Sequence, residues 1–177
     1  MKPEKYRAIR EPLGPLYTAA AGAAGMYLRV RCGLRVEKAD PIPETGPLLV
    51  VASHQGMVDF AVTAAALLPR RLHFVCAEDF FRIAPLAPVL HAMGVVPKTQ
   101  FQADPRCIAS ILRVLKRGGA VCIYPEGQTS MTGLSGDIAP HIARLAKKAG
   151  APVASLRLHG GFFTRSRLAC GLNPGRI

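Results

Sequence analysis

The chain has 177 residues, 50% of them hydrophobic, and carries 23 basic against 11 acidic residues. This length is enough for one domain with a substantial core, and the formal net charge of +12 predicts an anionic partner: an acidic membrane surface, phosphorylated substrates or an acidic carrier protein. We expect no nucleic-acid partner, because the basic residues are scattered, aromatic residues are sparse, and no zinc-finger, RNP or helix-turn-helix signature occurs.

The sequence pattern of residues 1–46 predicts an N-terminal helix followed by a loop. The segment Leu13–Val30 is largely Ala and Gly, it is interrupted by glycines and a proline, and it ends in Arg29 and Arg31. It is too weakly hydrophobic for a transmembrane helix, and no secretory signal precedes it. We therefore expect a membrane-associating, interfacial helix on anionic lipid at the cytoplasmic face of the cell membrane. An ordinary packed first helix is the alternative.

The sequence pattern of residues 47–177 predicts one α/β domain with a mostly parallel sheet flanked by helices. Several apolar runs are continuous, as expected for strands covered on both faces, and they alternate with segments of helical character. The predicted strands are Leu48–Ser53, Leu72–Ala77, Gly94–Lys98, Ala120–Tyr124 and Pro152–Leu158. The predicted helices are Val58–Leu68, Asp79–Met93, Pro105–Arg117 and Ile138–Ala149.

The third of these helices has the clearest boundaries. Asp104 is a good N-cap, Pro105 suits the first helical position, and Gly118 and Gly119 end the helix. Its predicted apolar face consists of Ile108, Ile111, Leu112 and Leu115.

A histidine and an aspartate lie between two apolar segments. His54 follows the run Leu48–Ala52, and Asp59 comes just before Phe60–Leu68. A strand therefore delivers His54 to its carboxyl end, where sites in parallel sheets lie, and a helix begins with Asp59 in its first turn. The four intervening residues let the chain turn back, so that the carboxylate can orient the imidazole as a general base toward a hydroxyl group.

Glu126 and Gly127 follow the strand predicted at Ala120–Tyr124. They are expected to place a carboxylate and an exposed backbone N–H beside the same crevice as His54. A solvated turn carboxylate is the alternative for Glu126.

We expect no metal site and no structural zinc. The cysteines are odd in number, far apart and without a CxxC pair, which indicates a reduced, cytoplasmic environment. The other histidines lack metal-ligand spacing and are interpreted as structural or solvated: His73, His91, His141 and His159.

The motifs around these residues resemble the glycerolipid acyltransferase family, the 1-acyl-sn-glycerol-3-phosphate acyltransferases and their lysophospholipid relatives. The family's first motif, a histidine and an aspartate separated by four residues, matches His54 and Asp59. Its aromatic-Pro-Glu-Gly motif matches Tyr124 to Gly127, and a Pro-Val segment of a late strand matches Pro152 and Val153. The resemblance covers roughly residues 20 to 165.

The chain departs from the family pattern at several positions. Ser53 stands where the family usually has asparagine, and Ser155 lies near the place of a second proline on the late strand. Lys98 replaces an arginine, and Gln128 and Thr129 stand where threonine followed by arginine or lysine is common.

A phosphate-binding arginine is therefore missing, and arginine and lysine hold phosphate differently. We expect Lys98, Arg165 and Arg167 to replace it as acceptor-binding cations. The chain also ends at Ile177, earlier than family members usually do, as expected of a domain truncated at its C-terminus.

The resemblance implies transfer of a fatty acyl group from acyl-CoA or acyl carrier protein to a hydroxyl of lysophosphatidic acid or a related lysophospholipid. In this reading His54 and Asp59 are catalytic, Glu126 and Gly127 bind substrate, and no cofactor other than the thioester co-substrate takes part. Two alternatives stay open: an acyltransferase for a non-phosphate acceptor, and a non-catalytic basic protein that docks on membranes.

Overall fold

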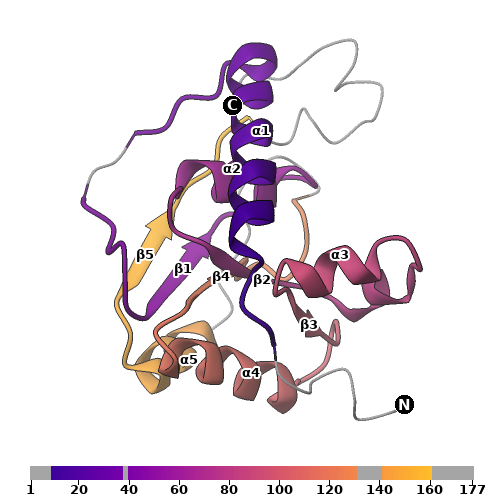
Figure 1. The fold of residues 1–177 in the computed structure, drawn as a ribbon. Coiled ribbons are helices and arrows are strands. Elements are labelled where there is room, and N and C mark those ends of the chain that lie inside the picture. The colour runs from indigo at the N-terminus through magenta and orange to yellow at the C-terminus, as the bar shows by residue number, and fades with distance from the viewer. Residues whose placement is uncertain (1–8, 38–39, 131–140, 161–177) are drawn as a thin grey trace.

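A parallel five-stranded sheet forms the centre of this computed structural model, which describes residues 9–37, 40–130 and 141–160. The strand order is β3-β2-β4-β1-β5, and every neighbouring pair is parallel (Figure 1). The strands are β1 Leu48–Ala52, β2 Leu72–Ala77, β3 Val96–Lys98, β4 Ala120–Ile123 and β5 Val153–Leu156. All five predicted strands are present, some of them shorter at an end, and the α/β class is confirmed.

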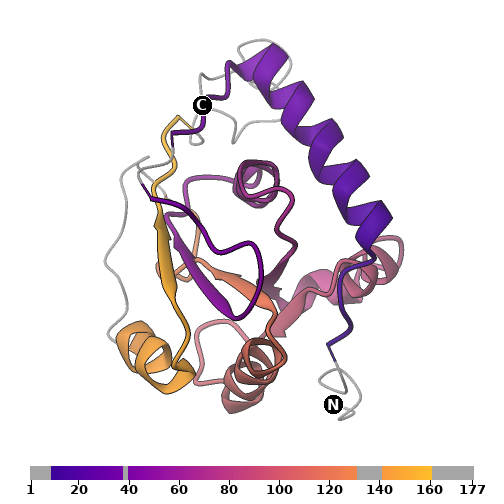
Figure 2. The same cartoon turned by 60° about the vertical axis from the view of Figure 1, so that its left-hand side comes forward.

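Helices cover both faces of the sheet (Figure 2). On one face, α1 (Gly14–Cys32) and α2 (Asp59–Ala66) pack on a core that includes Leu48 and Val50 of β1. On the other, α4 (Pro105–Lys116) and α5 (His141–Ala149) pack on a core that includes Leu49. Alternate side chains of β1 thus enter different cores, which explains the unbroken apolar run in the sequence.

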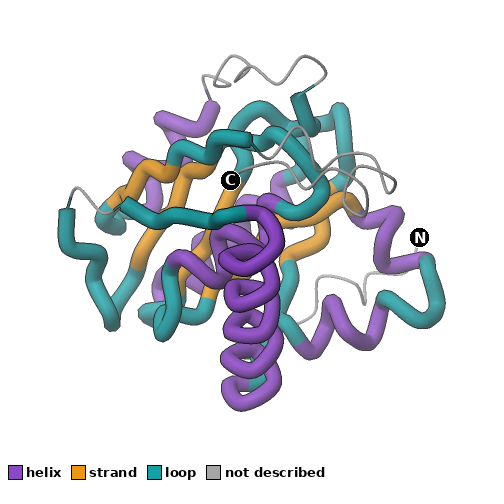
Figure 3. The backbone as a smooth tube through the Cα atoms, turned by 90° about the horizontal axis from the view of Figure 1, so that it is seen from above, coloured by secondary structure: helices purple, strands orange, loops and turns teal. Residues whose placement is uncertain are grey.

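The N-terminal helix α1 is continuous and packs closely on α2 (Figure 3). A Cβ atom added at Gly25 would lie 2.9 Å from the Cβ of Ala65, so the glycine that weakens the sequence signal is what lets the helices approach. The buried residues of α1 are Tyr17, Ala21, Gly25, Leu28 and Cys32. No helix in the described part of the chain is long and apolar enough to cross a membrane.

The prediction of one continuous helix over Asp79–Met93 is wrong. The structure has a 3-10 helix, η2, at Glu78–Arg82 and a separate short helix, α3, at Ala87–Ala92. Pro85 and Pro88 account for the break, because proline lacks an N–H donor and disfavours helical backbone in the residue before it.

Helix α4 begins and ends as the sequence predicts. The Asp104 side chain accepts a hydrogen bond from the Cys107 N–H at 2.9 Å, Pro105 is the first helical residue, and Gly118 has a φ of 81°. The predicted apolar face is wrong at one position: Ile108 is 38% exposed, while Cys107 is buried. Helix α5 begins at His141, and residues 138–140 of its predicted range lie outside the described residues.

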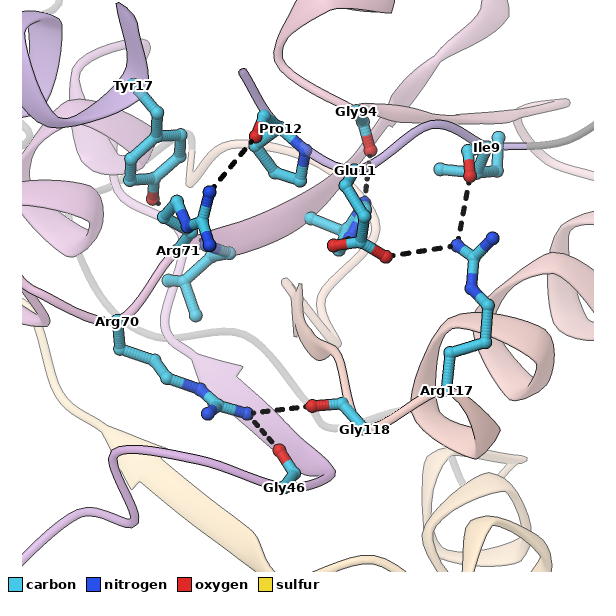
Figure 4. Close-up of polar contacts among 12 residues, drawn as sticks. Ile9, Glu11, Pro12, Tyr17, Gly46, Arg70, Arg71, Gly94, Arg117 and Gly118 are labelled. Atoms are coloured by element: carbon cyan, nitrogen blue, oxygen red, sulfur yellow. Dashed lines mark hydrogen bonds and ion pairs between the residues drawn. The ribbon is translucent and has the colours of Figure 1, made fainter. Parts of the chain in front are cut away.

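A polar network ties residues 9–13 to the amino-terminal edge of the sheet (Figure 4). Buried His73 has Nδ1 2.7 Å from the Gly94 carbonyl oxygen and Nε2 3.3 Å from the Glu11 carboxylate, which also lies 3.4 Å from Arg117. His73 is therefore structural, as its sequence context predicts. The neighbouring Arg70 donates to the backbone carbonyls of Gly46 and Gly118.

Candidate active site

The register of β1 and β4 brings the two sequence motifs together. Val51 of β1 pairs with Ile123 of β4. His54 lies three residues beyond Val51, and Glu126 lies three residues beyond Ile123. Both segments leave the sheet at its carboxyl edge, and the His54 N–H donates to Glu126 Oε1 at 3.1 Å. The crevice that the sequence predicts at this edge is where the two motifs meet.

His54 and Asp59 form a hydrogen-bonded pair. His54 Nδ1 lies 2.8 Å from Asp59 Oδ2, and the side chains are 21% and 1% exposed. The same oxygen accepts hydrogen bonds from the N–H groups of Gln55 at 2.6 Å and Gly56 at 2.8 Å. A carboxylate that accepts from Nδ1 fixes the ring's orientation and leaves Nε2 as the proton acceptor.

The aromatic ring of Tyr124 covers one face of the histidine. The two ring centroids lie 4.3 Å apart with an interplanar angle of 22°. The phenol oxygen is 3.4 Å from Thr63 Oγ1 on α2, and burial raises the pKa of Tyr124 well above its usual value, so the phenol stays neutral. Sequence reasoning used this residue only as part of a motif; the signal for its role was an aromatic residue directly before Pro-Glu-Gly.

The loop after β4 also holds the backbone of His54. Besides the contact of Glu126 with the His54 N–H, the Ser130 N–H donates to the His54 carbonyl oxygen at 2.9 Å. Glu126 thus organises this loop, and its predicted contact with substrate stays a prediction. The prediction that the Gly127 N–H is exposed to the crevice is wrong. Gly127 has a φ of 73° and closes a turn, in which its N–H donates to the Tyr124 carbonyl oxygen at 3.1 Å.

Ser53, which precedes the histidine, connects β1 to the end of β5. Its Oγ accepts a hydrogen bond from the Leu158 N–H at 2.8 Å, and its own N–H donates to the Leu156 carbonyl oxygen at 3.0 Å. The serine therefore extends the pairing of the two strands beyond β1 and fixes the point at which His54 leaves the sheet.

The structure does not bring Lys98 to His54. Lys98 ends β3, and the strands β2 and β4 lie between β3 and β1, the strand that leads into His54. Three inter-strand spacings amount to about 14 Å. Lys98 instead lies near Cys107 at the start of α4, which packs beside β3. Arg165 and Arg167 lie outside the described residues.

Two of the buried cysteines, Cys107 and Cys122, are poor nucleophiles. Burial raises the pKa of Cys107 to about 12 and the pKa of Cys122 further, so both stay protonated thiols. Within the described ranges no group of three or more His, Cys, Asp or Glu side chains is placed to hold a metal ion. The ionisable pair at the carboxyl edge of the sheet is therefore the candidate centre for proton transfer.

Known proteins share both the sequence and the fold. The 1-acyl-sn-glycerol-3-phosphate acyltransferase of Bacillus subtilis (strain 168) is 25% identical over 112 residues, which cover 63% of this chain and 56% of the relative. A chloroplastic 1-acyl-sn-glycerol-3-phosphate acyltransferase of Arabidopsis thaliana is 27% identical over 132 residues, 72% of this chain and 36% of that protein.

The crystal structure of the 1-acyl-sn-glycerophosphate (LPA) acyltransferase PlsC from Thermotoga maritima superposes with a TM-score of 0.65. It is 22% identical and covers 78% of this chain and 54% of its own, so this likeness concerns the fold. The chain spans about half the length of the bacterial relatives and about a third of the plant one. The Acyltransferase family model matches residues 33–159, which include both motifs of the site, and the chain belongs to this acyltransferase family.

Proposed function

We propose that the protein transfers a fatty acyl group from a thioester to the free hydroxyl of lysophosphatidic acid. The observation that carries the proposal is the contact of His54 Nδ1 with buried Asp59 Oδ2 at 2.8 Å, at the carboxyl edge of a parallel sheet. Membership of the acyltransferase family and the names of the similar proteins, 1-acyl-sn-glycerol-3-phosphate acyltransferases, support the reaction and the acceptor.

His54 Nε2 takes the proton of the acceptor hydroxyl while the hydroxyl oxygen attacks the thioester carbonyl carbon. The tetrahedral intermediate then collapses with loss of the thiolate, which leaves as the thiol after it receives the proton from the imidazolium. The Asp59 carboxylate stabilises the imidazolium between these steps. No serine or cysteine nucleophile is needed in this direct transfer.

The oxyanion of the intermediate needs hydrogen-bond donors other than the backbone N–H groups nearest the pair. The N–H of His54 donates to Glu126, those of Gln55 and Gly56 donate to Asp59, and that of Gly127 donates to Tyr124. These four groups hold the loops in place, so the donor to the oxyanion must be another backbone N–H, one of these groups released when substrate binds, or a cationic side chain.

The test of the reaction is turnover by purified protein with a labelled acyl thioester and a panel of lyso-acceptors, with products identified by mass. We expect lysophosphatidic acid to be acylated by the wild-type protein and no transfer by folded His54→Ala protein. A circular dichroism spectrum of each variant separates loss of chemistry from loss of fold. Wild-type turnover by His54→Ala protein would refute the mechanism.

A neutral acceptor is the second candidate, because Gln128 and Thr129 stand where family members commonly carry a cation. The acceptor panel therefore pairs lysophosphatidic acid with monoacylglycerol and a lyso-amino-acid lipid. Faster turnover of either would replace the phosphate-bearing acceptor in this proposal. Absence of turnover with every acceptor and thioester, with membrane binding intact, would favour the non-catalytic alternative.

We also propose that α1 docks the protein on anionic membrane at the cytoplasmic face. On the side of α1 away from the core, Leu16, Met26, Tyr27 and Val30 are 49%, 63%, 52% and 74% exposed. Arg29 and Arg31 lie in the last turn, where they can meet anionic headgroups. On the buried side of α1, Leu28 and Cys32 pack in the same cluster as Leu158, whose N–H donates to Ser53 next to His54, so the end of α1 lies near the site.

Flotation with vesicles tests the docking. Met26→Ser/Val30→Ser protein should lose binding while it keeps its fold, because both side chains point away from the core. High salt should weaken the binding of wild-type protein to anionic vesicles. Binding that ignores lipid charge and the double substitution would contradict the proposal.

A further inference from the structure

A buried carboxylate with few partners lies at the carboxyl end of β2. Glu78 is 6% exposed, and its Oε2 atom has no hydrogen-bond partner among the described residues. Its other oxygen, Oε1, makes a long contact of 3.9 Å with the guanidinium of Arg82. Arg82 is itself exposed and lies closer, at 3.1 Å, to the exposed Asp79 carboxylate. The buried charge of Glu78 is therefore compensated only in part within the described chain.

Two buried carboxylate oxygens in the described part of the chain lack a hydrogen-bond partner, Asp59 Oδ1 and Glu78 Oε2. Asp59 belongs to the proposed catalytic pair, whereas the proposed proton transfer does not involve Glu78. A buried polar atom without a partner destabilises the fold, and proteins keep such atoms chiefly where function requires them. Glu78 is therefore a candidate for contact with a ligand.

The register of the sheet places Glu78 in one row with the candidate active site (Figure 1). Phe74 of β2 and Val50 of β1 both pair with Cys122 of β4, so these three residues lie side by side. Four residues beyond them, in the same order of strands β2, β1 and β4, lie Glu78, His54 and Glu126. All three segments leave the sheet at its carboxyl edge and at the same level.

Glu78 also leaves β2 on the sheet face that the catalytic pair uses. Phe74 of β2 and Val50 of β1 enter the core under α1 and α2, and side chains at even spacings along an extended chain share a face. Tyr124, which stacks on His54, packs against the same core. The strands β2 and β1 are separated by two inter-strand spacings, about 10 Å. A molecule of that length can therefore contact both Glu78 and His54.

The chemistry of Glu78 favours a cationic group at this place. An ionised carboxylate accepts its strongest hydrogen bonds from charged N–H donors, and it repels a phosphate dianion placed beside it. In lysophosphatidylethanolamine, the chain from the free hydroxyl oxygen to the ammonium nitrogen extends up to about 10 Å, at roughly 1.2 Å per bond. Lysophosphatidic acid ends at its phosphate, at about half that length. A lysolipid hydroxyl at His54 thus leaves an ammonium, and not a terminal phosphate, level with Glu78.

We propose that Glu78 binds a primary ammonium group in the head of the acyl acceptor. The inference rests on the proposed acyl transfer and names the head group that the acceptor site favours. The ammonium supplies the donor that Oε2 lacks and neutralises the buried charge. Arg82 is exposed and pairs more closely with Asp79, so the ammonium can replace it beside Oε1. Glu78 therefore determines acceptor specificity and takes no part in the proton transfer.

The experiment compares lysophosphatidylethanolamine with lysophosphatidic acid, both with the same acyl chain, in neutral detergent micelles with one acyl thioester. Wild-type protein should show a kcat/KM about tenfold or more higher for lysophosphatidylethanolamine. Glu78→Gln keeps the shape of the side chain without its charge. It should raise the KM for lysophosphatidylethanolamine about tenfold or more, with kcat within twofold, because it removes binding and not proton transfer. The KM for lysophosphatidic acid should stay unchanged or fall.

Two measurements separate this role from general charge effects and from support of the fold. Glu44→Gln makes the same change in net charge on the loop before β1, where the backbone carbonyl of Glu44 and not its side chain contacts Arg70. This control should keep the wild-type preference between the two acceptors. The urea midpoint of Glu78→Gln protein should be unchanged or higher than that of wild type, because the substitution removes a buried charge that is only partly compensated.

A lyso-amino-acid lipid identifies the source of the ammonium. Its amine belongs to an amino acid and not to a phosphate ester. If wild-type protein prefers this lipid and Glu78→Gln protein loses the preference, the ammonium at Glu78 is that of an amino-acid head. A preference for lysophosphatidylethanolamine that Glu78→Gln abolishes assigns it to an aminophospholipid.

Several outcomes would overturn the inference. Equal effects of Glu78→Gln on all acceptors, or no effect on any, would show that the carboxylate does not select the head group. A lower urea midpoint with equal losses on all acceptors would show that Glu78 supports the fold. Wild-type protein that prefers lysophosphatidic acid to both amine-bearing lipids would refute the inference and leave the proposed acyl transfer standing. Absence of turnover with every acceptor would refute the proposed function and this inference with it.

Discussion

Replacement of Asp59 by asparagine separates the electrostatic role of this residue from its structural one. Oδ2 accepts three hydrogen bonds, from His54 Nδ1, the Gln55 N–H and the Gly56 N–H, at 2.6 to 2.8 Å. The carboxamide oxygen of asparagine can accept from the two backbone donors, so the loop should keep its shape. It carries no charge, however, and cannot stabilise the imidazolium that forms when His54 takes the proton.

The contacts of Asp59 determine how much each substitution should change kcat and the free energy of unfolding. Loss of the general base's charged partner should lower kcat by about 10² to 10⁴. Asp59→Asn should change the free energy of unfolding by about 1 kcal/mol, since the backbone donors keep a neutral acceptor. Asp59→Ala should cost about 2 to 6 kcal/mol, because it leaves two buried N–H groups unsatisfied at about 1 to 3 kcal/mol each.

The assay measures thiol release from the thioester beside a urea titration of each variant. His54→Ala/Asp59→Asn protein should be no slower than His54→Ala alone, because the two side chains act as one unit. Folded Asp59→Asn protein with wild-type kcat would refute the reasoning. So would a double variant whose losses simply multiply, because independent effects would show that the 2.8 Å contact is not the functional one.

Three further predictions follow from other contacts. Tyr124→Phe keeps the ring that stacks on His54 and should retain activity. Tyr124→Leu removes the ring and should lower kcat about tenfold and shift the pH–rate profile. Equal pH–rate profiles for the two variants would contradict a positioning role of the ring. Gly94→Ala should lower the urea-unfolding free energy by about 2 to 3 kcal/mol, because φ is 64° and a Cβ would lie 2.9 Å from His73 Nδ1. Burial raises the pKa of the Tyr17 phenol to about 12 in the folded protein, above its unfolded value near 10. The folded state therefore holds this proton more tightly, and the stability that the neutral phenol contributes is complete below pH 10 and is lost as pH rises toward 12. Tyr17→Phe protein should show a smaller loss of melting temperature over that range.

Local chemistry in the sequence was enough to predict the strands and the histidine–aspartate pair. The strand β1 is apolar on both faces because each face meets a different core, and such runs are visible without a structure. The turn from His54 to Asp59 is equally local, since the carboxylate that begins α2 accepts the N–H groups of the intervening loop.

The contacts that the sequence did not reveal depend on which strands become neighbours. The order β3-β2-β4-β1-β5 results from crossovers that pass over intervening strands, and no residue pattern within β3 encodes its position at the edge. The stacking of Tyr124 on His54 and the bond from the His54 N–H to Glu126 both require β4 to lie beside β1. The break between η2 and α3, by contrast, was foreseeable from Pro85 and Pro88.

The strand order also changes which cations are expected to hold the acceptor's phosphate. Lys98 ends an edge strand and lies near Cys107 of α4, on the sheet face opposite α1 and α2. Tyr124, which stacks on His54, packs against the core on the α1–α2 face. An ammonium at Lys98 would have to cross two strands and change faces to reach a substrate at His54. The remaining candidates by sequence are Arg165 and Arg167, which follow β5, the direct neighbour of β1.

Lys98→Ala should therefore leave the KM for lysophosphatidic acid within twofold of wild type. Arg165→Ala and Arg167→Ala should raise it about tenfold or more, with kcat nearly unchanged, because they remove binding and not proton transfer. Monoacylglycerol, the same acceptor without its phosphate, is the matched control, and its KM should not respond to either arginine. A tenfold rise for Lys98→Ala with lysophosphatidic acid alone would show that the edge strand does reach the phosphate, against the strand order. Equal losses on both acceptors would show that the arginines support the fold and do not bind the phosphate.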